Sequence, residues 1–522
     1  MRADLRTPFV YFILAVLGFS FWFLMAVPFA SHRETYWWLA MVRTQPFAQA
    51  FGYISSTYRP LAQGATWMAF RILDPVIFPT SVARQALLQG MVYGLFVFAW
   101  WLIYSAGPQK RLLAVVAFVA GGVFFPGYIH LFHIYGLFYV PVILTLGALL
   151  YLQASGKFEQ REVWVALVAI PLVFWHPFAA ALFVGFYFGF YLDTFRQRSG
   201  ARHAQAVAIL LVGMAAIAWM VVIFPRSASM AGTFPRTAAM PLDTRLLGFL
   251  ASYQTNEVNH AASLVAFLMT QLAVFSTAFS SRLKWIAVFL VTGLSVVFLM
   301  QDLPVLLMWL CAVLVKLLWM RRWSLFFLAL TAAILPFGGA IGSPAYVLFA
   351  VIVAVYATSL DWTRAEESLS FLKPQYAAAI VAGVAIVVLL VRAGIEVPVV
   401  SRVANPLLSE RERTYQLEDI LVWLHSSEYC GSDIALTESA GSPVESVANA
   451  IERRYRPPAQ LQDVNLFWET ILRCQQSPGA NQKGGTAVLT FGGQEMLGMS
   501  RAFKIPGKYA GEAAVWVSNR DR

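Results

Sequence analysis

Long apolar runs recur along most of this chain, and they constrain its fold more than any other feature. The run at residues 8–28 carries no charged side chain and has about the length, roughly 20 residues, that a helix needs to cross a bilayer. Its bulky aromatic stretch at 19–23 contains no small-residue cleavage site, which favours a retained anchor over a secretory signal. Further runs follow at 83–105, 112–125, 131–152, 163–175, 178–192, 207–224, 261–279, 285–300, 304–318, 325–337, 346–360 and 376–391.

The runs predict an all-α polytopic membrane bundle of about thirteen transmembrane helices. Composition supports this class, because 59% of the 522 residues are hydrophobic and only 12% are charged, whereas about a quarter of the residues in soluble domains are charged. We therefore expect residues 1–395 to form a transmembrane domain.

Basic residues in the short loops predict the orientation of this domain. They fall on alternate sides of consecutive runs, all on one face, and the positive-inside tendency assigns that face to the cytoplasm. They are Arg2, Arg6, Lys110, Arg111, Lys157, Arg161, Arg196, Arg198, Arg202, Arg282, Lys284, Arg321, Arg322, Arg364 and Lys373. The N-terminus is then cytoplasmic, and the loops 29–82 and 225–259 lie outside. This placement accounts for most of the formal net charge of +11, and no nucleic-acid-binding motif is present.

Residues 396–522 have the composition of a soluble domain, and an odd number of spans places them outside the membrane. Helical periodicity at 410–426 and 464–475, and short apolar runs at 434–437, 486–491 and 513–517, predict a small extracytoplasmic α/β domain. Cys430 and Cys474 both fall in it, and an oxidising compartment would allow them to form a disulfide. The expected location of the protein is a bacterial inner (plasma) membrane, with this domain in the periplasm.

The outer loops contain the candidate site. Glu34 lies just beyond the first apolar run and is a candidate catalytic base. The candidate substrate-binding residues around it are His32, Tyr58, Arg59, Arg226, Arg236, Arg245 and His260. Arginine binds phosphate through two parallel hydrogen bonds, and arginines outside the membrane run against the positive-inside tendency, so we expect an anionic ligand.

A first span is followed by a long outer loop with an acid near its start and the element Tyr58-Arg59-Pro60-Leu61, and then by many further spans and an outer C-terminal domain. In this arrangement the chain resembles the GT-C superfamily of polytopic glycosyltransferases. The resemblance implies transfer of a sugar from a polyprenyl-phosphate carrier to an extracytoplasmic lipid or glycan acceptor. It implies that Glu34 is the base and that Arg59 binds phosphate or fixes the loop. Many members have an Asp or paired acids where this chain has a lone Glu.

The chemistry gives the same division of roles. Inverting transfer needs a carboxylate to take the acceptor proton and cations to hold the departing phosphate. No Asp-x-Asp pair occurs in the outer loops, so we expect no obligatory metal or other cofactor, although Asp74, Asp243 and Glu257 are candidate ligands if they converge.

Other classes of protein remain alternatives. A transporter or flippase for lipid-linked glycans would carry ionisable residues near the bilayer midplane and often internal repeats, whereas these runs contain few charges and no repeat. A polymerase or ligase for lipid-linked glycans is a third reading. A membrane acyltransferase using His133 or His176 is a fourth, but His176 precedes Pro177 and is first expected to cap the start of a helix.

Overall fold

The computed structural model describes part of the chain. The described segments are 59–73, 134–220, 241–253, 260–275, 281–300, 304–338, 347–358, 360, 433–436, 486–490, 498–509 and 511–518, with short or single positions at 47–48, 94–95, 98–99, 101–102, 412, 416, 419–420, 423, 427, 493 and 495–496.

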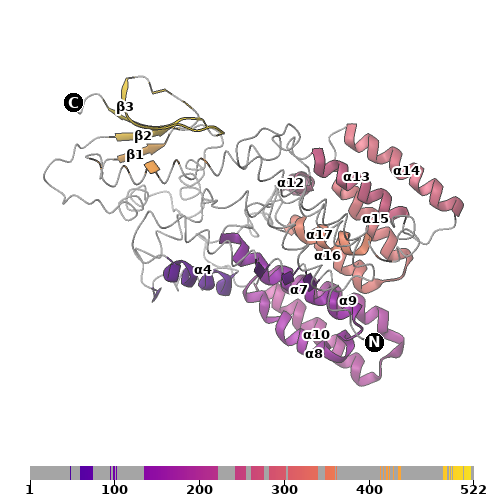
Figure 1. The fold of residues 1–522 in the computed structure, drawn as a ribbon. Helices are drawn as coiled ribbons and strands as arrows, with labels where there is room; N and C mark the ends of the chain where they lie inside the picture. Colours follow the sequence, from indigo (N-terminus) through magenta and orange to yellow (C-terminus); the bar gives the residue numbers. More distant parts are fainter. Residues whose placement is uncertain are drawn as a thin grey trace, which may run out of the picture.

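These residues are mostly helical, as the sequence predicts, with one small sheet near the C-terminus (Figure 1). The helices are α4 (Pro60–Leu73), α7 (Ile134–Ala154), α8 (Phe158–Ala169), η3 (Pro171–Phe174), α9 (Pro177–Thr194), η4 (Phe195–Gln197), α10 (Gly200–Ala218), α12 (Leu242–Tyr253), α13 (His260–Phe275), α14 (Ser281–Met300), α15 (Val305–Trp319), α16 (Trp323–Gly338) and α17 (Val347–Thr358).

Within the described residues, two helical stretches are long and apolar enough to cross a membrane, Pro177–Gln197 and Gly200–Ala218. Shorter apolar helices are Phe138–Ala154, Val305–Trp319, Trp323–Phe337 and Val347–Thr358. The number of about thirteen spans is thus not established by the described part of the chain, and the runs at 8–28, 112–125 and 376–391 lie outside it.

Two predicted spans have different bounds. The run at 207–224 corresponds to α10, which begins earlier, at Gly200. The run at 163–175 belongs to α8, which begins earlier, at Phe158, and to the short 3-10 helix η3 that follows it. The α-helix ends at Ala169 because Pro171 has no backbone N–H to donate and its ring is incompatible with a continuing helix.

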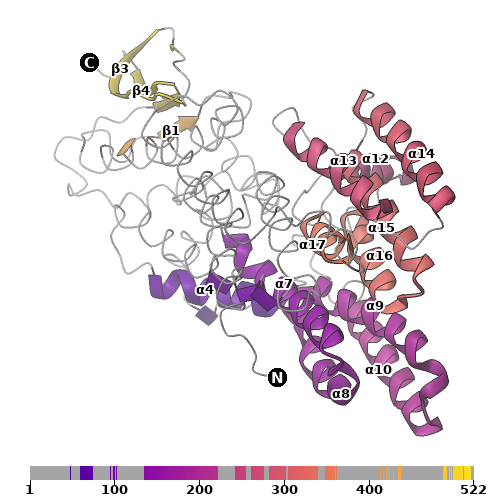
Figure 2. The same cartoon turned by 45° about the vertical axis from the view of Figure 1, so that its right-hand side comes forward.

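Among the described helices, α9 and α16 share the most extensive contact (Figure 2). A Cβ on Gly185 would overlap the side chain of Thr331, and one on Gly189 would overlap the backbone of Trp323 and Ser324. Small residues of this kind let two helix backbones approach closely.

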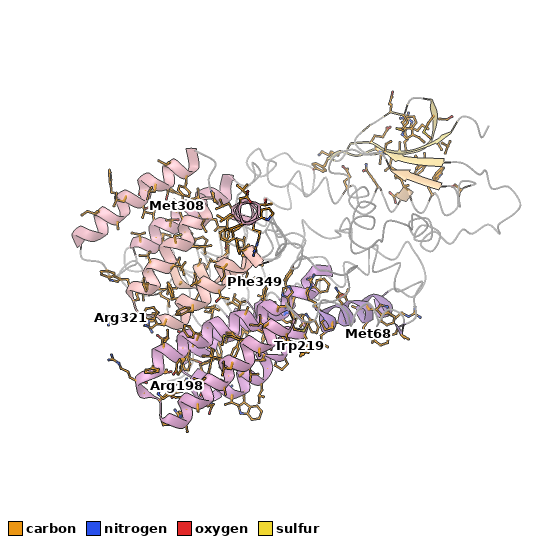
Figure 3. All side chains as sticks on the ribbon, turned by 180° about the vertical axis from the view of Figure 1, so that it is seen from behind. Met68, Arg198, Trp219, Met308, Arg321 and Phe349 are labelled. Carbon is orange, nitrogen blue, oxygen red and sulfur yellow. The ribbon has the colours of Figure 1, made fainter. Side chains whose placement is uncertain are left out.

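Three turns that contain basic residues meet at one end of the helices, here called the basic end. The carboxylate of Asp193 accepts hydrogen bonds from the backbone N–H groups of Trp323 (3.0 Å) and Ser324 (2.9 Å), the first residues of α16. Gln153 Nε2 donates to Ser324 Oγ, and Arg202 pairs with Glu159. The turns at 153–162, 193–202 and 320–324 therefore lie together, and Figure 3 shows Arg198 and Arg321 at this end.

The sheet has four strands, β1 (Asp433–Leu436), β2 (Thr486–Thr490), β3 (Met499–Ile505) and β4 (Ala513–Ser518), in the order β1-β2-β4-β3. β1 and β2 are parallel and the other pairs are antiparallel. The predicted strands at 434–437, 486–491 and 513–517 are confirmed, whereas β3 was not predicted. Its register is irregular between Arg501 and Phe503, which disturbs the alternation of apolar and polar residues.

Helical residues at 412, 416, 419, 420 and 423 agree with the predicted helix at 410–426. Trp423 stacks on Phe503 of β3, with ring centroids 4.8 Å apart. Gln416 Nε2 donates to the carbonyl of Gly511, and Glu412 accepts from the backbone N–H of Lys508. These contacts attach the helical residues to the sheet. The predicted helix at 464–475 and both cysteines of the predicted disulfide, Cys430 and Cys474, lie outside the described residues.

Candidate functional site

The structure describes three of the residues that the sequence singles out for the site. Arg59 and Arg245 are described with their side chains, and His260 is described as the first residue of α13. The remaining candidates lie outside the described residues, and these are His32, Glu34, Tyr58, Arg226 and Arg236. The geometry of the site is therefore built around the two arginines.

Arg59 immediately precedes α4. Pro60 occupies the first helical position, where its fixed φ favours the helix and its missing N–H costs nothing. The Arg59 carbonyl accepts the first hydrogen bond of the helix, from the N–H of Gln63. Because α4 packs against α7 and η3, the arginine side chain is buried, with 6% of its surface exposed.

The guanidinium of Arg59 lies over an aromatic ring. Its Cζ atom is 4.6 Å from the centroid of Phe138, a residue in the second turn of α7. A cation over the face of an aromatic ring is attracted by the ring quadrupole, and the attraction is stronger where water is excluded. Phe138 therefore fixes the position of a buried cation at the start of α7.

His176 lies close to Arg59, at the junction of η3 and α9. It has extended backbone geometry, and its side chain accepts a hydrogen bond at Nδ1 from the N–H of Phe178 (3.2 Å), which caps α9 as the sequence predicts. The imidazole is 1% exposed and is flanked by the rings of Tyr139 (5.1 Å) and Phe178 (4.5 Å). Its other nitrogen, Nε2, is buried and has no hydrogen-bond partner among the described residues.

The protonation state of His176 follows from these surroundings. Burial lowers the pKa of His176 well below its usual value of 6.5, and the positive charge of Arg59 lowers it further. The imidazole is therefore neutral near pH 7. Because Nδ1 accepts from Phe178, the single proton of the neutral ring is on Nε2. The site thus combines a permanent cation with a neutral N–H donor.

Two helices begin at these two residues, because α4 starts at Pro60 and α9 starts at Pro177. Arg59 precedes α4, Phe138 and Tyr139 lie in the second turn of α7, and His176 precedes α9. Tyr139 and Phe178 both contact the ring of Phe349, in the first turn of α17, at centroid distances of 5.9 and 6.2 Å. Helix N-termini carry partial positive charge, so their convergence favours an anion. We call the group Arg59, Phe138, Tyr139, His176, Phe178 and Phe349 the Arg59 site.

The Arg59 site and the basic end lie at opposite ends of α9. His176 caps the first residue of this helix, while Asp193 and Arg198 are at its other end. With a rise of 1.5 Å per residue, the 18 residues of α9 span about 27 Å, close to the roughly 30 Å thickness of a bilayer core.

Arg245 also lies away from the basic end. Its Cζ atom is 4.5 Å from the centroid of Phe337, near the end of α16 that is distant from Trp323. The hydroxyl of Tyr253 donates to the carbonyl of Ala333 and holds α12 against the same end of α16. Arg59 stacks on α7 and Arg245 on α16, so the two predicted phosphate ligands are attached to different helices.

The buried charges at the basic end are satisfied by protein groups. The carboxylate of Glu162 accepts from Arg198, Tyr187 and Gln205, at distances of 2.7 to 3.4 Å. The ammonium of Lys316 donates to the carbonyls of Thr358 (3.0 Å) and Leu360 (2.8 Å) at the end of α17. These groups join helices, and their hydrogen bonds indicate a structural role.

The sequence singled out Arg59 as a phosphate ligand, whereas His176 was expected first to cap a helix and, as an alternative, to act in an acyltransferase. The His-Pro pair predicts the cap, whereas the approach of Arg59 depends on the packing of α4 against η3. Within the described residues there is no group of three or more side chains that could hold a metal ion. Comparisons with protein-family models, with curated proteins and with solved structures find no match to this chain.

Proposed function

We propose that this protein is a membrane glycosyltransferase that moves a sugar from a polyprenyl-phosphate carrier to an extracytoplasmic lipid or glycan acceptor. The observation that carries the proposal is the position of Arg59. This predicted phosphate ligand is buried beside a neutral histidine donor, where α4 and α9 begin, and is separated from the basic end by the length of α9.

The surface of the helices supports a membrane location. Large apolar side chains are exposed along the outward faces of α8, α10 and α14, including Trp164 (72% exposed) and Phe289 (79% exposed). Extended apolar surface of this kind is unusual on a soluble protein and is normal where lipid is the solvent. If the basic end is cytoplasmic, as the positive-inside tendency indicates, the Arg59 site lies at the extracytoplasmic end.

The chemistry assigns a role to each candidate residue. An acceptor hydroxyl oxygen forms a bond to the anomeric carbon while the bond between that carbon and the carrier phosphate breaks. The phosphate leaves with the electron pair, and Glu34 takes the hydroxyl proton. Arg59 stabilises the charge that develops on the phosphate, an effect that is strong where water is excluded. Arg226, Arg236, Arg245 and His260 are further candidates for holding the donor.

The buried charges argue against a transporter as the first choice. Transport pathways use ionisable residues that face a cavity near the bilayer midplane. Glu162, Arg198 and Lys316, the buried charged residues of the described helices α8, α9–α10 and α15, instead lie near helix ends and bond to protein groups.

The proposal is tested by measuring transfer of radiolabelled sugars from a panel of polyprenyl-phosphate donors in membranes that contain the wild-type chain, Glu34→Gln or Asp243→Asn. Asp243 is an exposed acid in the other outer loop and serves as the matched control. We expect transfer by the wild type and by Asp243→Asn, and loss of transfer in Glu34→Gln with normal insertion. Equal transfer by all three would contradict the assignment of Glu34, and no transfer from any donor would contradict the function.

A further inference from the structure

We infer that His176 is a second phosphate-binding residue of the Arg59 site, donating a hydrogen bond from Nε2 to a phosphate oxygen held by Arg59. The identification of this phosphate with that of the lipid carrier rests on the proposed function, whereas the binding of phosphate by the two residues does not.

The first argument is the unused hydrogen-bond capacity of the imidazole. Nδ1 is occupied by the N–H of Phe178, so Nε2 carries the proton. Nε2 is buried and has no partner among the described residues. A buried N–H group without an acceptor costs free energy, and native proteins rarely retain one unless a ligand, ion or water supplies the acceptor.

The second argument is the charge of the surroundings. The missing acceptor must be compatible with the guanidinium of Arg59 and with the N-termini of α4 and α9. All of these favour a negative group. A phosphate oxygen accepts hydrogen bonds from both a guanidinium and a neutral imidazole, and it supplies the acceptor that His176 Nε2 lacks among the described residues. Carboxylates are also anionic, but the helix starts and the arginine together form the arrangement that binds phosphate elsewhere in proteins.

The third argument concerns specificity. The pKa of His176 is lowered, so the ring adds a donor without adding a second charge. The neutral N–H group of His176 can keep its hydrogen bond to the phosphate both before transfer, when the phosphate is esterified to the sugar, and after transfer, when the sugar has left. Nε2 is shielded from solvent in this structure.

Two substitutions separate binding from capping. Asn in place of His176 keeps a side-chain oxygen that can cap α9 and removes the distal donor. Gln places an amide N–H near the position of Nε2 and weakens the cap. The purified full-length chain is placed in nanodiscs of a neutral phospholipid, and binding of radiolabelled polyprenyl monophosphate is measured beside the thermal unfolding midpoint.

For His176→Asn we expect affinity for polyprenyl monophosphate to fall about tenfold or more with an unfolding midpoint close to that of the wild type. For His176→Gln we expect affinity within about threefold of the wild type with a lower midpoint. The reverse pattern, full affinity in His176→Asn and lost affinity in His176→Gln, would show that His176 only caps α9 and would overturn the inference.

If neither variant folds, nitrogen-15 NMR of the wild-type histidines provides the second measurement. One imidazole that stays neutral well below pH 6.5 should show a shift of its Nε2–H signal on addition of polyprenyl monophosphate. No response from such an imidazole would also overturn the inference.

Competition identifies the source of the phosphate. Inorganic phosphate and phosphatidic acid are each tested as competitors of polyprenyl monophosphate. Weak competition by both compounds supports the lipid carrier as the source of the phosphate. If either compound competes as strongly as unlabelled polyprenyl monophosphate, the carrier assignment is overturned, although the site still binds phosphate. His176-dependent binding without any sugar transfer would support the inference and contradict the proposed function. Sugar transfer that is unchanged in His176→Asn would support the proposed function and contradict the inference about His176.

Discussion

Arg198 and Glu162 form a buried ion pair that joins the link between α9 and α10 to the start of α8. The distance from Arg198 Nη2 to Glu162 Oε2 is 2.7 Å, and the two side chains are 2% and 7% exposed. Tyr187 and Gln205 donate to the same carboxylate. Each carboxylate oxygen therefore has two donors, and the pair fixes three helices at the basic end.

Removing the cation should destabilise this end strongly. In Arg198→Met, the Glu162 carboxylate stays buried without its positive partner, and we expect the free energy of unfolding to fall by about 3–5 kcal/mol. Arg202 pairs with Glu159 in solvent, with both side chains about half exposed, so Arg202→Met should change stability by less than about 1 kcal/mol. Denaturant unfolding in detergent measures both, and equal effects would contradict the structural role of the buried pair.

Gly189 permits the close approach of α9 to α16. In Gly189→Ala the new Cβ would overlap the Trp323 backbone, which is held by Asp193, so we expect a loss of about 2–3 kcal/mol or more. Gly293 of α14 has open space around it, and Gly293→Ala should be neutral or stabilise by about 0.5–1 kcal/mol. A comparison of the two unfolding free energies checks this difference, and a tolerant Gly189→Ala would show that the two helices can separate at little cost.

The helical elements could be predicted from the sequence because a run of apolar residues has few other solutions. The helices α9, α13, α15, α16 and α17 begin and end within a few residues of the predicted runs. The run at 163–175 was misplaced because α8 begins with a polar turn from Phe158, and Glu162 in this turn is buried through its ion pair with Arg198, which hydrophobicity alone does not reveal.

The candidate site was predictable only in part. The element Tyr58-Arg59-Pro60-Leu61 singled out Arg59, and the His-Pro pair predicted the cap formed by His176. These two residues come together through packing among α4, α7 and η3, and no local sequence pattern predicts this packing. Strand β3 was missed for a related reason, because its irregular register and the charges of Arg501 and Lys504, three positions apart, interrupt the apolar alternation of the strand.

The lowered pKa of His176 has a consequence for stability. Below about pH 6.5 the unfolded imidazole binds a proton that the folded one does not. The free energy of unfolding therefore decreases as the pH is lowered, by up to about 1.4 kcal/mol per pH unit. Arg59 and the ring of Tyr139 face the imidazole. His176→Asn should lose this part of the slope, as unfolding midpoints at several pH values would show. Parallel curves would mean that His176 is protonated in the folded protein.

The proposed orientation can be tested with single cysteines in a background where Cys311, Cys430 and Cys474 are replaced by Ser. Position 202 is at the basic end, and position 243 is in α12, at the other end of α16. A membrane-impermeant maleimide should label Asp243→Cys in intact spheroplasts and Arg202→Cys only after permeabilisation. Labelling of both from one side would contradict the orientation.

The central claim is that Arg59 binds the phosphate of the sugar donor, and the most direct measurement is the donor concentration dependence of sugar transfer by Arg59→Gln, Arg59→Lys and Arg71→Gln. Arg71 is the matched control, since it is an exposed arginine in the last turn of the same helix. We expect kcat/KM for the donor to fall about 100-fold or more in Arg59→Gln, to recover partly in Arg59→Lys, and to stay near the wild-type value in Arg71→Gln. Wild-type kcat/KM in a correctly inserted Arg59→Gln would contradict the account.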